Sequence, residues 1–178
     1  MNFSLLKHAA TAAIAAAAIG AAAPASAQDC RRAIESGFSY CLPDGWTAKA
    51  GDQQKFKVYL APPGETFTPN VNFNEVDDTR SLADWVALNV KTMTDDPKKM
   101  GATSFRVLGQ SDFATTSGER GTRVAMDIST AQVSVRLYQY YFSGRAAKKY
   151  LASCIGLQTL QSLESTCDRM FRTFRLDP

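Results

Sequence analysis

The sequence predicts an α+β fold, in which an antiparallel β-sheet packs against helices. The first indication is the segment from Val133 to Ile155, where two apolar runs flank a Ser143-Gly144-Arg145 turn and predict a β-hairpin. The second is a pair of segments with helical periodicity, residues 82–93 and 160–174. The spacing of the turns between the strands favours antiparallel neighbours over parallel crossovers.

Six or seven strands are expected along the chain, and turn residues mark their limits. Pro43-Asp44-Gly45 follows the first strand, Pro62-Pro63-Gly64 ends the second, and Ser117-Gly118-Glu119 follows the fourth. The predicted strands are 38–42, 55–60, 70–76, 105–113, 122–128, 133–142 and 150–155.

Two amphipathic helices are expected. Ser81 and Asp84 form a capping-box-like pair at the start of the first helix, which Asp95-Asp96-Pro97 ends. The closing helix carries one long apolar stripe, formed by Leu160, Leu163, Cys167, Met170, Phe171 and Phe174.

The N-terminus has the pattern of a cleaved export signal. Lys7 supplies the positive region, residues 9–23 are almost all alanine, and Ala25-Ser26-Ala27 forms an A-x-A cleavage site. This apolar run is shorter than the ~20 residues that a transmembrane helix needs. We therefore expect cleavage after Ala27, a mature single domain of residues 28–178, a periplasmic or secreted location, and no membrane span after cleavage.

Removal of this signal limits the chemistry of the mature chain. The only histidine, His8, would leave with it, and the chain would lose the commonest general base and the commonest transition-metal ligand. Lys7 would leave as well, so that 19 Lys and Arg face 17 Asp and Glu. A net charge of +2 is too small to indicate nucleic acid or a membrane surface as a partner.

All four cysteines, Cys30, Cys41, Cys154 and Cys167, would remain in the exported chain. An even number favours disulfides, and sequence alone permits three connectivities. We favour Cys30–Cys41 and Cys154–Cys167 because each pair closes a short local loop. The spacings do not resemble those of structural zinc sites, and there is no C-x-x-C redox motif.

No motif for catalysis or cofactor binding is present in the mature chain. It contains no G-x-x-x-x-G-K-[ST], no G-x-G-x-x-G, no G-x-S-x-G and no S-x-x-K. We expect no catalytic residue, no metal, no cofactor and no enzymatic activity. Acid–base work by two carboxylates needs no histidine, so Glu65, Glu75, Glu119 and Glu164 are candidates by residue type alone.

Arginine and tyrosine gather on one face of the predicted sheet. Arg136, Tyr138 and Tyr140 alternate along one strand, and Arg123 lies on the strand before it. A face that mixes these residue types is typical of protein-interaction hot spots. The alternative is that a helix covers this face and leaves the tyrosine hydroxyls at its edge.

The order of short motifs resembles a known superfamily. Leu42-Pro43-Asp44-Gly45-Trp46 is followed by Pro69-Asn70-Val71-Asn72-Phe73, the helix of residues 81–93, a meander of strands, and Met170-Phe171-Arg172-Thr173-Phe174. Over nearly all of the mature chain, this order resembles the PsbP photosystem extrinsic protein, DcrB-type periplasmic proteins and a yeast Ran-binding relative. The resemblance implies an α/β/α sandwich, with a central antiparallel sheet of six or seven strands and helices on both faces.

That superfamily implies no common chemistry, since its members are mostly non-enzymatic accessory or binding proteins and a fold does not settle function. None of its functional residues can be placed on this chain. We therefore expect an exported, non-catalytic accessory or binding protein that contacts an unidentified protein partner in the cell envelope. The alternative is a periplasmic small-ligand carrier, or a carboxylate-based enzyme, with a pocket between sheet and helix.

Overall fold

The computed structural model describes residues 30–51, 53–64 and 67–178. The predicted signal peptide and its cleavage site lie outside these residues. The strands are β1 (Arg32–Glu35), β2 (Phe38–Cys41), β3 (Thr47–Ala48), β4 (Tyr59–Leu60), β5 (Asn70–Asp77), β6 (Ser104–Ala114), β7 (Arg120–Ser129), β8 (Ser134–Ser143), β9 (Lys148–Leu157) and β10 (Arg175–Leu176). The helices are α1 (Leu82–Asp95), the 3-10 helix η1 (Pro97–Met100) and α2 (Leu163–Arg172).

A seven-stranded sheet forms the centre of the fold. Its strand order is β3-β4-β5-β9-β8-β7-β6, and every neighbouring pair is antiparallel. The predicted hairpin is β8 and β9, which pair with Tyr138 opposite Cys154. Because β9 also pairs with β5 and β8 with β7, the hairpin has a strand on each side. The prediction of an antiparallel sheet is therefore confirmed.

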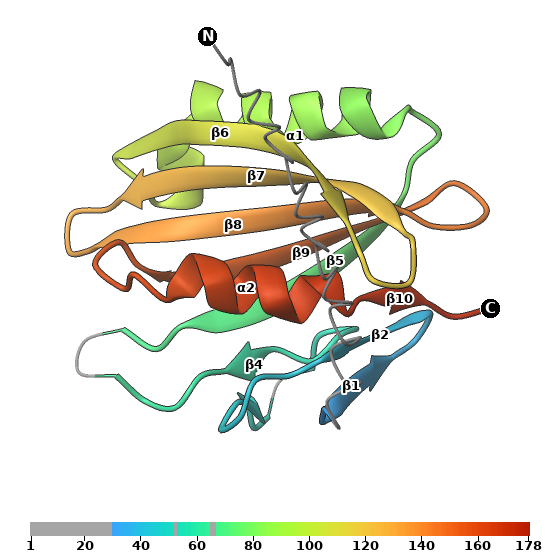
Figure 1. The fold of residues 1–178 in the computed structure, drawn as a ribbon. Coiled ribbons are helices and arrows are strands. Elements are labelled where there is room, and N and C mark those ends of the chain that lie inside the picture. The colour runs from blue at the N-terminus through green and yellow to red at the C-terminus, as the bar shows by residue number, and fades with distance from the viewer. Residues whose placement is uncertain (1–29, 52, 65–66) are drawn as a thin grey trace, which may run out of the picture.

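Helices cover both faces of this sheet, as the sandwich prediction requires. Along β8, Tyr138, Tyr140 and Phe142 point to one face and pack with α2 and the N-terminal strands. Val135 and Leu137 point to the other face and pack with α1. In Figure 1, α2 crosses the near face of the sheet and α1 lies behind β6. The protein has an α+β sandwich with two apolar cores, one on each side of the sheet.

A second, three-stranded sheet was not predicted. Its order is β1-β2-β10, and it pairs the last strand of the chain with the N-terminal hairpin. Phe38 and Tyr40 of β2 are fully buried against α2 and the large sheet. The strand expected at 38–42 is present as β2, but it lies in this small sheet rather than in the large one. The strands β1 and β10 have four and two residues, too few for a periodic sequence pattern, and β10 is defined by its pairing with a distant segment. This small sheet completes the cover over the face that carries α2.

Two predicted elements have different limits in the structure. The strand expected at 55–60 is wrong except for Tyr59–Leu60, although Phe56 and Val58 are buried from an irregular segment. The closing helix begins at Leu163 rather than Leu160, because two successive turns precede it: Leu160 N donates to Leu157 O, and Leu163 N donates to Leu160 O, each at 3.1 Å. Apolar periodicity therefore identified buried residues better than it identified strand and helix ends.

The first helix begins where its cap predicts. Ser81 is the N-cap, and its hydroxyl oxygen accepts a hydrogen bond from Asp84 N at 3.1 Å. Trp85, Val86 and Met93 bury the apolar side of α1. No helix in the described part of the chain is both long enough and apolar enough to cross a membrane.

Candidate functional site

A groove of about 770 Å³ lies between α1 and the sheet. Its walls include Trp85 and Met93 of α1, and its floor includes Ile128, Leu137, Leu151 and Ile155 of the sheet. The groove exists because the sheet is wider than the single helix that covers this face. Five strands from β5 to β6 span about 19 Å, whereas one helix is about 10 Å wide. Since α1 packs against β6, β7 and β8, the floor toward β9 and β5 is left open.

Three polar side chains form a row across this floor. Asn72 of β5 is opposite Ser153 of β9, and Ser153 is opposite Gln139 of β8. All three line the groove. Gln139 is 5% exposed and Ser153 is 8% exposed, so both lie at the bottom of the groove rather than at its rim. The Tyr141 hydroxyl donates to Gln139 Oε1 at 2.6 Å, which holds the Gln139 amide in place. Burial raises the pKa of Tyr141 above its ordinary value, so this hydroxyl keeps its proton.

The groove carries little charge. Among the residues that line it, the charged ones are Asp78 and Arg80, and they pair with each other at 3.6 Å between Arg80 Nε and Asp78 Oδ1. Within the described residues, no group of three or more His, Cys, Asp or Glu side chains is placed to hold a metal ion. An apolar floor with a few fixed hydrogen-bonding groups is the usual make-up of a small-molecule pocket, and 770 Å³ lies in the size range of such pockets.

The predicted Arg and Tyr surface lies on the opposite face, and α2 covers most of it. Tyr138 is 3% exposed and Tyr140 is fully buried. The Tyr140 hydroxyl donates to Asp168 of α2 and that of Tyr138 to Glu164. Burial and the bond to Asp168 raise the pKa of Tyr140. Both tyrosines therefore lie as in the second alternative of the sequence analysis, in which a helix covers this face.

The two arginines of that prediction are engaged in ion pairs. Arg123 lies over the Tyr138 ring at 4.7 Å, and its Nε is 3.0 Å from Asp168 Oδ1. Arg136 Nε donates to Asp127 Oδ1 at 2.9 Å. A hollow of about 290 Å³, bordered by both arginines and Tyr138, is what remains open beside α2.

The candidate carboxylates do not converge on one site. Glu75 pairs with Lys55 and Lys148, Glu119 is held by hydrogen bonds in the turn before β7, and Glu164 binds Arg123. Glu65 lies outside the described residues. Burial opposes ionisation of Glu75 and Glu119, but hydrogen bonds from Lys148 and Ser117 outweigh it and lower both pKa values. Neither residue has the raised pKa that a general acid requires.

Both favoured cysteine pairs lie at disulfide distance. The Cα atoms of Cys30 and Cys41 are 5.5 Å apart, and those of Cys154 and Cys167 are 6.2 Å apart. The second pair joins β9 to α2.

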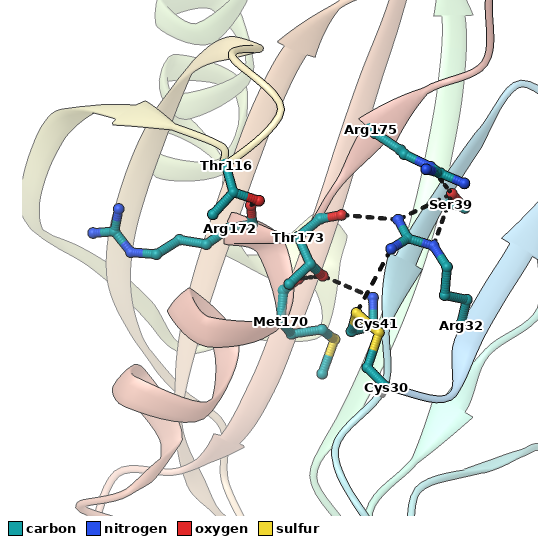
Figure 2. Close-up of a disulfide and its surroundings, with 9 residues drawn as sticks. All are labelled: Cys30, Arg32, Ser39, Cys41, Thr116, Met170, Arg172, Thr173 and Arg175. Carbon is teal, nitrogen blue, oxygen red and sulfur yellow. Dashed lines mark hydrogen bonds between the residues drawn. A yellow bond between two sulfur atoms is a disulfide. The ribbon is translucent and has the colours of Figure 1, made fainter. Parts of the chain in front are cut away.

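The first pair lies beside two arginines that share one acceptor. Figure 2 shows Arg32 and Arg175 converging on the Ser39 hydroxyl, at 3.2 Å from Arg32 Nη2 and 3.1 Å from Arg175 Nε. Burial, and then the charge of Arg175, lower the pKa of Arg32. Cys41 N donates to Thr173 Oγ1 at 2.7 Å, which links β2 to the end of α2.

Comparisons with known proteins agree with this architecture. A scan against protein-family models and a search of curated proteins found no match. Among solved structures, cyanobacterial PsbP (CyanoP) from Synechocystis sp. PCC 6803 superposes with a TM-score of 0.61 at 12% identity, covering 89% of this chain and 99% of that one. The chain has a PsbP-like fold.

Two further solved structures share the PsbP-like fold. The Saccharomyces cerevisiae Ran-binding protein Mog1p superposes with a TM-score of 0.56 at 12% identity, over 83% of this chain and 96% of that one. LpqN, involved in cell envelope biogenesis of Mycobacterium tuberculosis, has a TM-score of 0.54 at 11% identity, over 86% and 88%. The predicted resemblance is confirmed, and at these identities it shows the fold alone.

A pocket between sheet and helix was predicted as an alternative, but its residues were not located, although a signal for them was present. Gln139 and Ser153 interrupt the apolar side of two central strands, and Asn72 and Asn74 alternate with buried Val71 and Phe73. Polar residues on the apolar side of a central strand need hydrogen-bond partners or an opening to solvent. A search for such interruptions would have marked this face.

Proposed function

We propose that the protein is an exported, non-catalytic binding protein that holds a small ligand in the groove between α1 and the sheet. The observation that carries this proposal is the open apolar floor beside α1. The sheet is covered on its other face by α2 and the small sheet, whereas this face is covered by one helix. A ligand on the floor would remove apolar surface from water. Each Å² of apolar surface buried in this way contributes about 25 cal/mol of favourable free energy to binding.

The walls of the groove are fixed before any ligand arrives. Trp85 packs edge-on against Tyr141, with ring centroids 5.1 Å apart, and both side chains are buried. Asn89 Nδ2 donates to Trp85 O at 2.8 Å and so has a set orientation on α1. A preformed pocket spends less of its binding free energy on ordering side chains than a flexible one does.

The carboxylate-enzyme alternative has less support. Such an enzyme needs two acidic groups facing each other across a cavity. One carboxylate, Asp78, lines the groove among the described residues, and it is paired with Arg80. We therefore favour the hypothesis of a small-ligand carrier over that of a carboxylate-based enzyme.

A probe-binding experiment tests the proposal with two matched variants. Leu88 lines the groove and is 43% exposed, whereas Leu160 lies before α2, outside the groove lining, and is 39% exposed. The neutral fluorophore N-phenyl-1-naphthylamine should bind the wild-type protein saturably and with increased fluorescence. Leu88→Glu should weaken this binding at least about fivefold, because a charge at the groove must be desolvated, and Leu160→Glu should not. Equal binding by both variants, or no saturable binding at all, would contradict the proposal.

Export is proposed on two grounds. The N-terminal sequence has the pattern of a cleaved signal, and the two cysteine pairs at disulfide distance fit an oxidising compartment. Intact-mass analysis of the protein from a periplasmic extract should give a chain that begins at Gln28 and lacks four thiol hydrogens. A full-length, reduced chain in the cytoplasm would overturn this part of the proposal.

Contact with a protein partner in the cell envelope stays a prediction, and one structural feature favours a place for it. The strand β6 pairs with β7 along one side only and forms an edge of the sheet, and it exposes Val107 and Leu108. Such an edge can accept an added strand. A photo-crosslinking residue at position 108 should capture an envelope protein that the same residue at position 165 on α2 does not. Identical products from the two positions would contradict docking at β6.

A further inference from the structure

We infer that the groove selects neutral, mainly apolar molecules that carry a hydrogen-bond acceptor, such as a carbonyl oxygen, near their middle. This inference rests on the proposed binding function and adds the chemistry of the ligand. It is carried by the row of Asn72, Ser153 and Gln139 across the floor.

The row contains hydrogen-bonding groups that line the groove and that no described residue uses. Gln139 Oε1 accepts from Tyr141, but the Gln139 amide N–H groups make no hydrogen bond to any described residue. The Ser153 hydroxyl likewise has no partner among the residues that the structure describes, although both side chains are more than nine-tenths buried. Among the described residues, the fully enclosed side-chain atoms without a hydrogen-bond partner are Tyr40 Oη and Arg123 Nε, so the Gln139 amide nitrogen and the Ser153 hydroxyl are accessible. The groove is where a ligand or water can complete them. Since both line the groove, a molecule inside it can accept from both.

The spacing of the row suits a single acceptor. Residues directly opposite each other on antiparallel strands have Cβ atoms about 5 Å apart. One carbonyl oxygen between Ser153 and Gln139 can therefore reach the hydroxyl and the amide together. Asn72, one strand further on, offers the same kind of donor.

Apolar side chains flank the row on both sides along the strands. Leu137 is opposite Ile155 on one side of the row, and Leu151 lines the groove on the other side, opposite Asn74. The hydrogen-bonding groups thus lie in the middle of the floor rather than at one end of it. A ligand that matches this pattern has apolar arms on either side of its acceptor.

The electrostatics of the groove favour a neutral ligand. The charged residues in its lining, Asp78 and Arg80, neutralise each other. A ligand with a net charge would lose its hydration without gaining an unpaired opposite charge.

Isomeric ketones test the inference, because they share a composition and differ in the position of the oxygen. The ketones 6-undecanone, with a central carbonyl, and 2-undecanone, with a terminal one, would compete with N-phenyl-1-naphthylamine for the wild-type protein. We expect the central ketone to bind about fivefold more tightly, which corresponds to one additional satisfied hydrogen bond. Ser153→Ala should reduce this preference, and so should Asn72→Ala. Ser165→Ala on the exposed side of α2 is the control and should retain it.

The Ser153→Ala variant should fold normally, because the lost hydroxyl has no partner within the described protein. Its thermal midpoint should equal that of the wild type, which separates a binding role from a structural one. Equal competition by the two ketones, with probe binding and its loss in Leu88→Glu intact, would overturn this inference and leave the binding function standing. Absence of saturable probe binding would overturn both.

Discussion

Arg123 illustrates how a side chain with the composition of an interface residue becomes part of the core. It reaches from β7 beneath α2, where its guanidinium contacts the Tyr138 ring and pairs with Glu164 and Asp168. Its side chain is 16% exposed. Burial opposes the charge, but Asp168 outweighs it and raises the pKa of Arg123. We therefore assign Arg123 to the docking of α2.

Replacement of Arg123 tests that assignment. Arg123→Ala should lower the free energy of unfolding by about 2 kcal/mol, because Glu164 loses a charged hydrogen bond and Asp168 loses an ion pair. Arg120→Ala is the control, since Arg120 is exposed on the same strand and makes no ion pair with a described residue. Urea denaturation measures both. If Arg123→Ala were as stable as Arg120→Ala, the ion pairs of Arg123 would contribute nothing to the free energy of unfolding.

Asp127 makes the stability of the fold depend on pH. It lies between Arg106 on β6 and Arg136 on β8, directly opposite both in the strand register. Burial opposes its ionisation, but hydrogen bonds from Arg136 at 2.9 Å and Arg106 at 2.7 Å outweigh it and lower the pKa of Asp127. A lowered pKa in the folded state means that the unfolded state binds the proton more tightly. This carboxyl therefore stabilises the fold above the unfolded pKa of about 4, and its contribution is lost as the pH falls from there through the folded pKa.

The Asp127→Asn variant should remove this dependence. It should be less stable than the wild type at pH 7, and the loss of stability between pH 7 and pH 3 should be smaller than in the wild type. Denaturant unfolding at both pH values measures the difference. Asp112→Asn, at an exposed position on β6 without an ion pair to a described residue, should keep the wild-type profile. If the free energy of unfolding fell equally with pH in the wild type and in Asp127→Asn, Asp127 would not be the source of this pH dependence.

At the scale of elements, the strands and helices with long periodic patterns were predictable. The hairpin of β8 and β9 and the helix α1 follow from alternation, turn residues and the Ser81 cap, all of which are local in sequence. The strand β10 was not predictable, because it is two residues long and exists through pairing with β2. The residues of the groove were not located for a related reason. Gln139 and Ser153 face each other in the hairpin, but Asn72 joins them only when the distant strand β5 pairs with β9 in register.

The Cys154–Cys167 pair should control one element in particular. It joins β9 to α2 across 13 positions of sequence, so its loss should cost roughly 3 kcal/mol and loosen α2 first. In the Cys154→Ala/Cys167→Ala double variant, amide hydrogen exchange should accelerate in α2 far more than in α1. The Cys30→Ala/Cys41→Ala variant is the matched control and should affect the N-terminal hairpin of β1 and β2. Equal acceleration in α1 and α2 would contradict this role.

At the scale of the whole molecule, the two faces of the sheet are unequal. One carries α2 and a three-stranded sheet, and it buries the ring cluster of Phe38, Tyr40, Phe73, Phe171 and Phe174. The other carries α1 over part of its width and retains a groove of about 770 Å³. The face that carries α2 holds the fold together, and the face that carries α1 is available for binding. The PsbP-like fold is consistent with this division, but it does not specify a ligand.

The division between the two faces can be measured directly by methyl NMR during titration with N-phenyl-1-naphthylamine. We expect saturable shifts confined to methyl groups that line the groove, with those of the opposite core unchanged. Shifts in the opposite core, or no saturable shifts anywhere, would contradict it. The groove methyls to follow are those of Ile128, Val135, Leu137, Leu151 and Ile155, and the reference methyls are those of Val71 and Leu163.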